Sequence, residues 1–204
     1  MRSVLRGLAV VAGALFLLAD GSPSEAERVI AAASAPFAPL AAYTFDVHVD
    51  VAMKSFPYLA FRLDGTGRWQ RPDLYSIAFR HVPWFAKGFE NAKIDPLQPQ
   101  TWAHDYEFLG VAGTGERRTL SMRERAQPGN MKTIEADFDG DGLRRIDWEY
   151  RNGGAIVVEI DPVRVEGVPL PAVERTDLRL PGYHVLGVAR FSNYTLIRTE
   201  PAQH

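Results

Sequence analysis

Three closely spaced aspartates have side chains and a spacing that could bind a metal ion. Asp137, Asp139 and Asp141 alternate in the segment D-F-D-G-D-G, and carboxylates at such positions could supply the hard oxygen ligands of a calcium loop. A loop of that kind ends on a bidentate Glu, but Trp148 stands at this position and Glu149 follows one residue late. Because apolar alternation flanks the segment on both sides, we predict a hairpin turn, with a weak calcium site as the alternative.

A second set of polar residues alternates within the stretch Tyr43–Met53. Asp46, His48 and Asp50 share one face if this stretch is extended, and such a spacing could hold a metal ion. Alternating polar residues are equally typical of the solvated face of a sheet. We interpret the three residues as a solvated face and expect neither a metal nor another cofactor.

The catalytic motifs that a sequence can reveal are missing here. The chain contains no G-x-S-x-G nucleophile elbow, no H-E-x-x-H zinc motif and no glycine loop for phosphate. It contains no cysteine, which excludes disulfides, thiolate metal sites and thiol nucleophiles. Its formal charge of -2 does not indicate the excess of basic residues that is typical of proteins that bind nucleic acid. We therefore expect a protein that is not an enzyme and that does not bind nucleic acid.

The N-terminus resembles an export signal. Arg2 and Arg6 precede an uncharged apolar run from Gly7 to Ala19, which has the length of a signal-peptide core and falls short of the ~20 residues of a membrane span. We predict a signal peptide over residues 1–19, with Ala26 as the alternative cleavage site, followed by one domain over residues 20–204. The expected location is periplasmic or secreted.

The elements that position the remaining residues are mostly strands. Tyr43–Met53 shows strict alternation of apolar and polar residues, which predicts one long strand with an apolar face turned away from water and a polar face exposed to it. A capping box at Ser24 predicts a short helix to about Ala35, and no later segment shows convincing helical periodicity. Further strands are predicted at Tyr58–Gly67, Leu74–Val82, Tyr106–Val111, Glu116–Arg125, Met131–Phe138, Leu143–Arg151, Ala155–Val165, Arg175–Leu180 and Tyr183–Arg198.

An amphipathic antiparallel sheet of this size must have its apolar face covered, and one short helix cannot cover it. The sheet must therefore curl into a barrel or partial barrel, or pair as a sandwich. A partly open barrel could keep an apolar cavity, which would suit an acyl chain or another hydrophobe.

The segment 83–102 breaks the strand pattern and is unusually long for a connection. It has no sustained period, contains several prolines and carries four aromatic residues, Trp84, Phe85, Phe89 and Trp102. Such a segment could form a lid at the mouth of a cavity or an ordinary packed loop.

The order of these features resembles the LolA/LolB-like superfamily of periplasmic lipoprotein and lipid carriers. The local pattern consists of a glycine, an apolar residue, a basic residue, a proline and an aromatic residue; these are Gly65 or Gly67, Trp69, Arg71, Pro72 and Tyr75. The later hairpin pair D-G-D-G-L-R-R-I-D-W-E-Y-R-N-G-G is also similar to the family's central strands. The resemblance implies a mainly β fold, a curved antiparallel half-barrel closed on its concave side by helices, that holds acyl chains without catalysis.

Our leading hypothesis is an exported protein that carries or holds lipid or lipoprotein acyl chains. Its partners would be a lipid or an acylated protein, together with a membrane donor or acceptor protein. The expected lipid-binding residues are apolar residues of the first three strands and of the aromatic loop: Phe45, Val47, Val49, Val51, Leu59, Phe61, Trp69, Tyr75, Ile77, Trp84, Phe85 and Phe89. One alternative is an envelope scaffold or regulator that binds a protein through loop 83–102, and another is a hydrolase with carboxylate or His chemistry.

Overall fold

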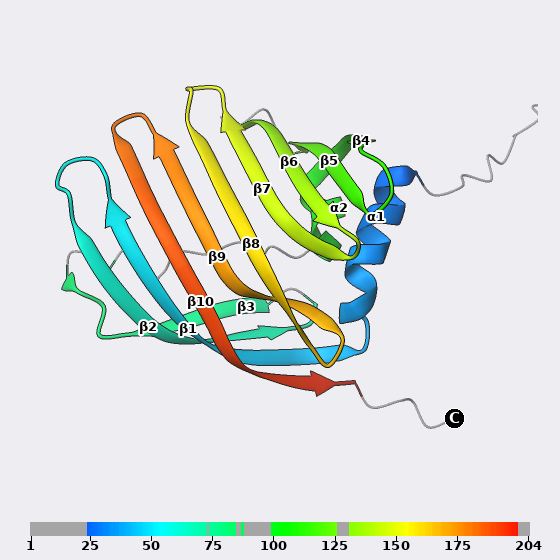
Figure 1. The fold of residues 1–204 in the computed structure, drawn as a ribbon, viewed down its shortest axis with the longest axis horizontal. Helices are drawn as coiled ribbons and strands as arrows, with labels where there is room; N and C mark the ends of the chain where they lie inside the picture. Colours follow the sequence, from blue (N-terminus) through cyan, green and yellow to red (C-terminus); the bar gives the residue numbers. More distant parts are fainter. Residues whose placement is uncertain (1–23, 73, 85–86, 88–98, 126–130, 200–204) are drawn as a thin grey trace, which may run out of the picture.

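A computed structural model describes residues 24–72, 74–84, 87, 99–125 and 131–199. Their main feature is one ten-stranded antiparallel sheet, with helix α1 (Glu25–Ser34), the short 3-10 helix η1 (Ala35–Phe37) and helix α2 (Pro99–Asp105) beside it (Figure 1). The strands run in the order β3-β2-β1-β10-β9-β8-β7-β6-β5-β4, so β3 and β4 are the two edges and the sheet is not closed into a barrel. The predicted curved half-barrel is confirmed.

The strands are close to those predicted from the alternation of apolar residues. Their bounds are β1 Leu40–Met53, β2 Ala60–Gln70, β3 Leu74–Arg80, β4 Tyr106–Ala112, β5 Arg117–Glu124, β6 Met131–Asp139, β7 Gly142–Tyr150, β8 Ala155–Val165, β9 Val168–Leu180 and β10 Tyr183–Arg198. The largest difference is β9, which begins seven positions before the predicted Arg175. Its first half contains two prolines and no alternation of charge, so the usual strand signals are weak there.

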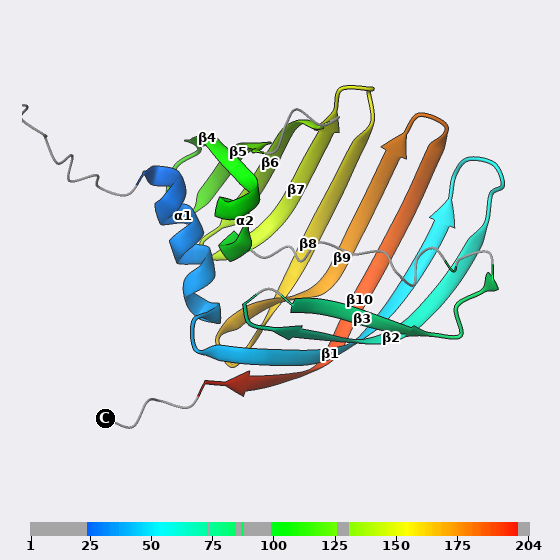
Figure 2. The same ribbon diagram turned by 180° about the vertical axis from the view of Figure 1, so that it is seen from behind.

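Helix α1 begins where the capping box predicts. The Ser24 hydroxyl accepts a hydrogen bond from the Glu27 amide, and the Glu27 carboxylate accepts one from the Ser24 amide. Three apolar residues one or two turns apart, Ala26, Ile30 and Ala33, are buried. Figure 2 shows the helix lying along the concave side of the sheet, beside the half that contains β4 to β7.

Helix α2 is a further helix, in a segment that shows no convincing helical periodicity in the sequence. It spans seven residues, which is too short for apolar periodicity to stand out from the flanking loop. Its Trp102 is buried, and the centroid of the Trp102 ring lies 6.1 Å from that of Phe138 on β6. Part of the aromatic segment 83–102 is therefore a packed helix against the sheet, while residues 85–86 and 88–98 lie outside the described part.

Most of the buried apolar side chains of the described residues fall into two clusters. The first lies between the helices and the sheet and contains Ala26, Ile30, Ala33, Trp102, Leu120, Met122, Ile134, Ala136, Phe138, Leu143, Ile146, Val158 and Ile160. The second lies where β1, β2, β9 and β10 bend, and contains Leu40, Tyr43, Phe45, Val47, Trp69, Val168, Leu170 and Phe191. The register of β1 against β10 shifts near both Leu40 and Thr44, and such irregularities bend a strand and increase its twist.

The convex face carries the charged residues. His48 lies 2.7 Å from Asp64, and Asp50 binds Arg190 at 2.6 Å and Arg62 at 3.0 Å. The hydrogen bond from Arg190 is the main reason that the pKa of Asp50 lies below its usual range. These ion pairs support the interpretation of Asp46, His48 and Asp50 as a solvated face. In the described part of the chain no helix is long and apolar enough to cross a membrane.

Candidate binding site on the concave face

Three cross-strand rows of side chains point to the concave side in the middle of the sheet. Residues directly opposite each other in antiparallel strands point to the same face, so the register fixes the members of each row. The rows are Ile160, Glu174, Ala189, Val49 and Leu63; then Val158, Thr176, Gly187, Val51 and Phe61; then Ile156, Leu178, Val185 and Met53. We call these fourteen residues the trough.

The trough lies between the two core clusters. Val158 and Ile160 at one end belong to the first cluster, whereas Val49 and Ala189 pack against the second. Leu178, between these ends, is half-buried and belongs to neither cluster. The concave surface between the two clusters therefore carries mostly apolar side chains and keeps accessible area in its middle.

Two small residues on β10 leave space above the middle of the trough. Gly187 pairs with Val51 on one side and Thr176 on the other. A methyl group placed on Gly187 would meet one atom within 4 Å, the Cβ of Thr176 at 3.7 Å, so the space in front of this glycine is open. Ala189 follows on the same face and is also small. Because Gly187 and Ala189 have small side chains or none, they leave open space on the concave side of β10 beside Thr176.

Glu174 is the ionisable residue of the trough. It lies between Ile160 on β8 and Ala189 on β10. Among the described residues none forms a hydrogen bond or ion pair with its carboxyl group, and burial raises its pKa to about 7. As a whole residue Glu174 is nevertheless half-buried and keeps some accessible surface. An ionisable residue that is surrounded by protein yet keeps accessible surface fits the floor of a concavity, since a sealed core would leave it none.

Tyrosine hydroxyls lie on the same face toward the second cluster. Burial is the main reason that the pKa values of Tyr75 and Tyr194 are raised, and the charge of Glu174 raises both further. The Tyr194 hydroxyl donates a 2.7 Å hydrogen bond to the carbonyl oxygen of Pro171. Both hydroxyls therefore stay protonated at neutral pH, and neither can act as a general base there.

Several of the predicted lipid-binding residues are packed side chains of the second cluster. Phe45, Val47 and Trp69 are each less than 5% exposed. The Phe45 ring occupies the space that a side chain on Gly67 would need. The Trp69 indole N–H is buried without a hydrogen-bond partner. These side chains fill the bend of the sheet, and their contact with a ligand stays a prediction.

The other predicted residues lie in varied positions. Val49, Val51 and Phe61 are trough residues, while Tyr75 and Ile77 pack against the second cluster and Leu59 is half-buried beside β2. Trp84 is 82% exposed, and Phe85 and Phe89 lie outside the described residues. The structure thus brings together the predicted residues of β1 and β2 and leaves Trp84 exposed.

The aspartates of the possible calcium loop form a hairpin turn. Asp137 and Asp139 belong to β6, and Asp141 lies in the turn before β7. Asp139 lies 3.5 Å from Arg144, and Asp141 lies 2.5 Å from Arg164. Over the described residues no group of three or more His, Asp or Glu side chains could hold a metal ion. The predicted hairpin is confirmed; Asp139 and Asp141 pair with arginines, and Asp137 accepts a 2.7 Å hydrogen bond from the Thr119 hydroxyl.

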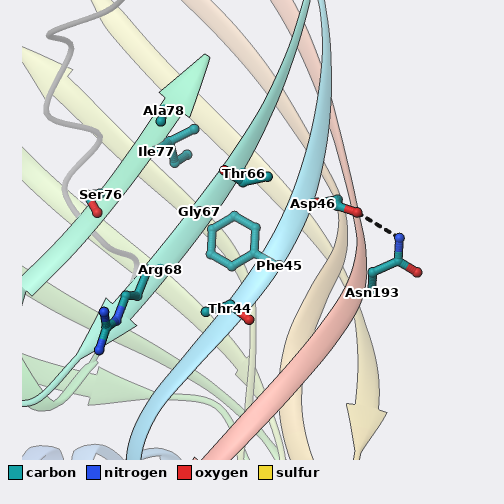
Figure 3. A pocket seen from close by; sticks show the side chains of 10 residues that line it. All are labelled: Thr44, Phe45, Asp46, Thr66, Gly67, Arg68, Ser76, Ile77, Ala78 and Asn193. Carbon is teal, nitrogen blue, oxygen red and sulfur yellow. Dashed lines mark hydrogen bonds between the residues drawn. The ribbon is translucent and has the colours of Figure 1, made fainter. Parts of the chain in front are cut away.

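A separate pocket of about 390 Å³ opens on the convex side of β1, β2 and β3 (Figure 3). Its walls carry mostly polar side chains, among them Thr44, Thr66, Arg68 and Ser76. The Asn193 amide closes one side of it by donating a 2.7 Å hydrogen bond to Asp46. This pocket lies on the opposite face of the sheet, so it does not extend the trough.

The lipid-binding residues predicted from the sequence include none from β8, β9 or β10. Ile156, Leu178 and Val185 face the trough because β8 and β9 pair in register with β10 beside β1. A local signal for Glu174 does exist: Arg175, Asp177 and Arg179 alternate on one face of β9, which places residue 174 on the other. The pairing of β1 with β10, about 140 positions apart, has no local signal.

Comparison with known proteins agrees with this geometry. No protein-family model matches the chain, and no curated protein matches its sequence. A solved DUF1329 family protein from Desulfovibrio piger is similar over 85% of this chain and 94% of its own, with a TM-score of 0.60 and 8% identity. A LolA superfamily protein from Nitrosomonas europaea is similar over 88% of this chain and 96% of its own, with a TM-score of 0.51 and 11% identity. The chain has a LolA-like fold.

At identities this low the likeness concerns the fold alone. An outer membrane lipoprotein-sorting protein domain from Vibrio parahaemolyticus is also similar, over 84% of this chain and 93% of its own, with a TM-score of 0.49 and 8% identity. The resemblance inferred from Gly67, Trp69 and their neighbours is confirmed for the architecture. In this LolA-like sheet, Gly67 and Trp69 themselves belong to the packed bend.

Proposed function

We propose that this LolA-like chain is an exported protein that carries or holds lipid or lipoprotein acyl chains, and that the trough is its binding surface. The proposal places the chain in the periplasm or outside the cell and assigns it no catalytic step. The observation that carries it is the middle of the trough, where apolar side chains such as Leu178 and Val185 are half-buried and belong to neither core cluster.

The energetics favour an apolar occupant. Removing apolar surface from water yields about 25 cal/mol per Å², so an acyl chain can be held along the trough with few polar contacts. The open space beside Gly187 allows such a chain to approach the backbone of β10 closely. The convex face also has a recess over β8 to β10, of about 520 Å³, but charged side chains such as Arg145, Asp177 and Arg179 line it.

Two leucines on neighbouring strands give a matched test. Leu178 on β9 faces the trough, whereas Leu186 on β10 faces the convex side opposite Asp177, and both are half-buried. We expect Leu178→Gln to weaken binding of the neutral fluorescent hydrophobe N-phenyl-1-naphthylamine by about tenfold, because it places an amide in the apolar wall. Leu186→Gln should leave binding unchanged.

Lipid that copurifies with the protein gives a second, independent measurement. Mass spectrometry of an organic extract should find acyl-chain lipid with the wild-type protein and less with folded Leu178→Gln. Equal weakening in both leucine variants, or a wild-type protein that binds no hydrophobe, would contradict the proposal.

A further inference from the structure

The ionised carboxylate of Glu174 gives the trough a negative charge that no described residue of the trough balances. The trough's described residues include no Lys, Arg or His. The basic residues of the same strands alternate to the convex face, where Arg175 binds Asp161 at 2.7 Å and Arg190 binds Asp50 at 2.6 Å. The side of Glu174 that faces the concavity therefore meets no cation from β8, β9, β10, β1 or β2.

The other titratable groups near Glu174 are hydroxyls. Burial is the main cause of the raised pKa values of Tyr75 on β3 and Tyr194 on β10, and the charge of Glu174 raises both pKa values further. Tyr43 on β1 acts on the same two tyrosines, and its ring lies 6.1 Å from that of Tyr194. The surroundings of the carboxyl are thus aromatic and apolar, an environment in which an organic cation is attracted both by a carboxylate and by the faces of tyrosine rings.

We propose that Glu174 is a polar subsite for the cationic head group of an amphiphile whose apolar tail lies along the trough. This inference rests on the proposed function and narrows its ligand to amines and quaternary ammonium compounds. A cation supplies the charge partner that Glu174 lacks. An anionic head group at this point would place two negative charges together in a poorly solvated site, which is unfavourable.

An uncharged tail over Glu174 is the competing arrangement. It would remove the carboxyl from water without giving it a partner, which favours the protonated form and costs free energy above the pKa of about 7. A cationic ligand instead stabilises the ionised form. The two arrangements therefore predict opposite effects of pH on binding.

Three ligands with the same tail test the inference: decyltrimethylammonium, decanol and decanoate. Each displaces bound N-phenyl-1-naphthylamine, at concentrations below micelle formation and at a pH above the carboxyl pKa of about 7. We expect the ammonium compound to bind about tenfold more tightly than decanol, and decanoate to bind more weakly than decanol. Glu174→Gln should remove both differences, since the amide carries no charge.

A matched control and a pH series complete the experiment. Glu159 on β8 faces the convex side, where it lies 3.2 Å from Arg145, so Glu159→Gln should keep the full preference for the cation. In the wild-type protein, affinity for decyltrimethylammonium should fall as pH is lowered through about 7, because the ligand charge is fixed and Glu174 becomes protonated. The pH series needs no variant, so it stands even if a substitution harms folding.

The outcomes separate this inference from the proposed function. Displacement by decanol with no preference for the ammonium compound, or a preference that survives Glu174→Gln, overturns the cation subsite and leaves a lipid-binding trough. No binding of the naphthylamine or of decanol overturns the lipid-binding function, and the subsite with it.

Discussion

The Phe45 ring and Gly67 are cross-strand partners, and the ring occupies the position that any side chain at residue 67 would need. The ring cannot easily move away, because its centroid lies 5.8 Å from Tyr75, 5.5 Å from Phe191 and 5.7 Å from Tyr194. The bend of the sheet is thus filled by its own aromatic side chains. The apolar ligand that we propose would therefore lie elsewhere on the concave face, in the trough, where Leu178 and Val185 are half-buried.

Gly67→Ala should destabilise the fold by about 3 kcal/mol, because the added methyl group overpacks a cluster with no room to relax. Urea denaturation measures the free energy of unfolding. Gly187→Ala is the control, since the same change on β10 meets open space and should alter stability by less than about 1 kcal/mol. Similar losses in the two variants would show that the bend is not tightly packed.

A larger side chain at Gly187 should block the trough without unfolding the protein. Gly187→Phe places a ring over the trough beside Thr176, at a position where an added Cβ meets ordinary van der Waals contact alone. We expect N-phenyl-1-naphthylamine affinity to fall by about tenfold, with Gly187→Ala close to wild type. A fluorescence titration checks this, with circular dichroism to confirm folding. Unchanged affinity in a folded Gly187→Phe variant would place the ligand elsewhere.

Glu174 should make the protein less stable as pH rises. Its folded pKa of about 7 lies above the ordinary 4.5, so the folded state holds the proton more tightly between these values. Stability from this residue is present below about pH 4.5 and is lost as pH rises through about 7. Relative to wild type, Glu174→Gln should therefore gain stability across this window, by up to about 3 kcal/mol.

Urea denaturation of both proteins at several pH values measures that difference. A stability difference that stays constant with pH would show that Glu174 titrates normally and is not on the floor of a concavity. Ligand-free protein is needed, because a bound cation would lower the folded pKa and reduce the effect.

Local patterns predicted most of the sheet and little of the site. The alternation within Tyr43–Met53 fixes a strand and its apolar face, and the capping box at Ser24 fixes the start of α1, because both depend on neighbouring residues. Whether the apolar face is filled depends on Phe191 and Tyr194, which approach through the pairing of β10 with β1. A single sequence carries no local record of that pairing.

The two glycine positions illustrate the same limit. Gly67 and Gly187 both interrupt strands, and in sequence both indicate a close approach or a bulge. In the structure Gly67 accommodates the ring of Phe45, whereas Gly187 leaves open space. The difference arises from the residue opposite each glycine, Phe45 in one case and Val51 in the other, and from the face that each pair lines.

The most direct test of the trough is protection of a single thiol by bound ligand. The chain contains no cysteine, so Leu178→Cys and Leu186→Cys each provide one reactive group, on opposite faces of adjacent strands. Decanol in the trough should slow labelling of Leu178→Cys by a thiol reagent several-fold and leave Leu186→Cys unaffected. Equal labelling rates at residue 178 with and without ligand, in a protein that still binds decanol, would contradict the account.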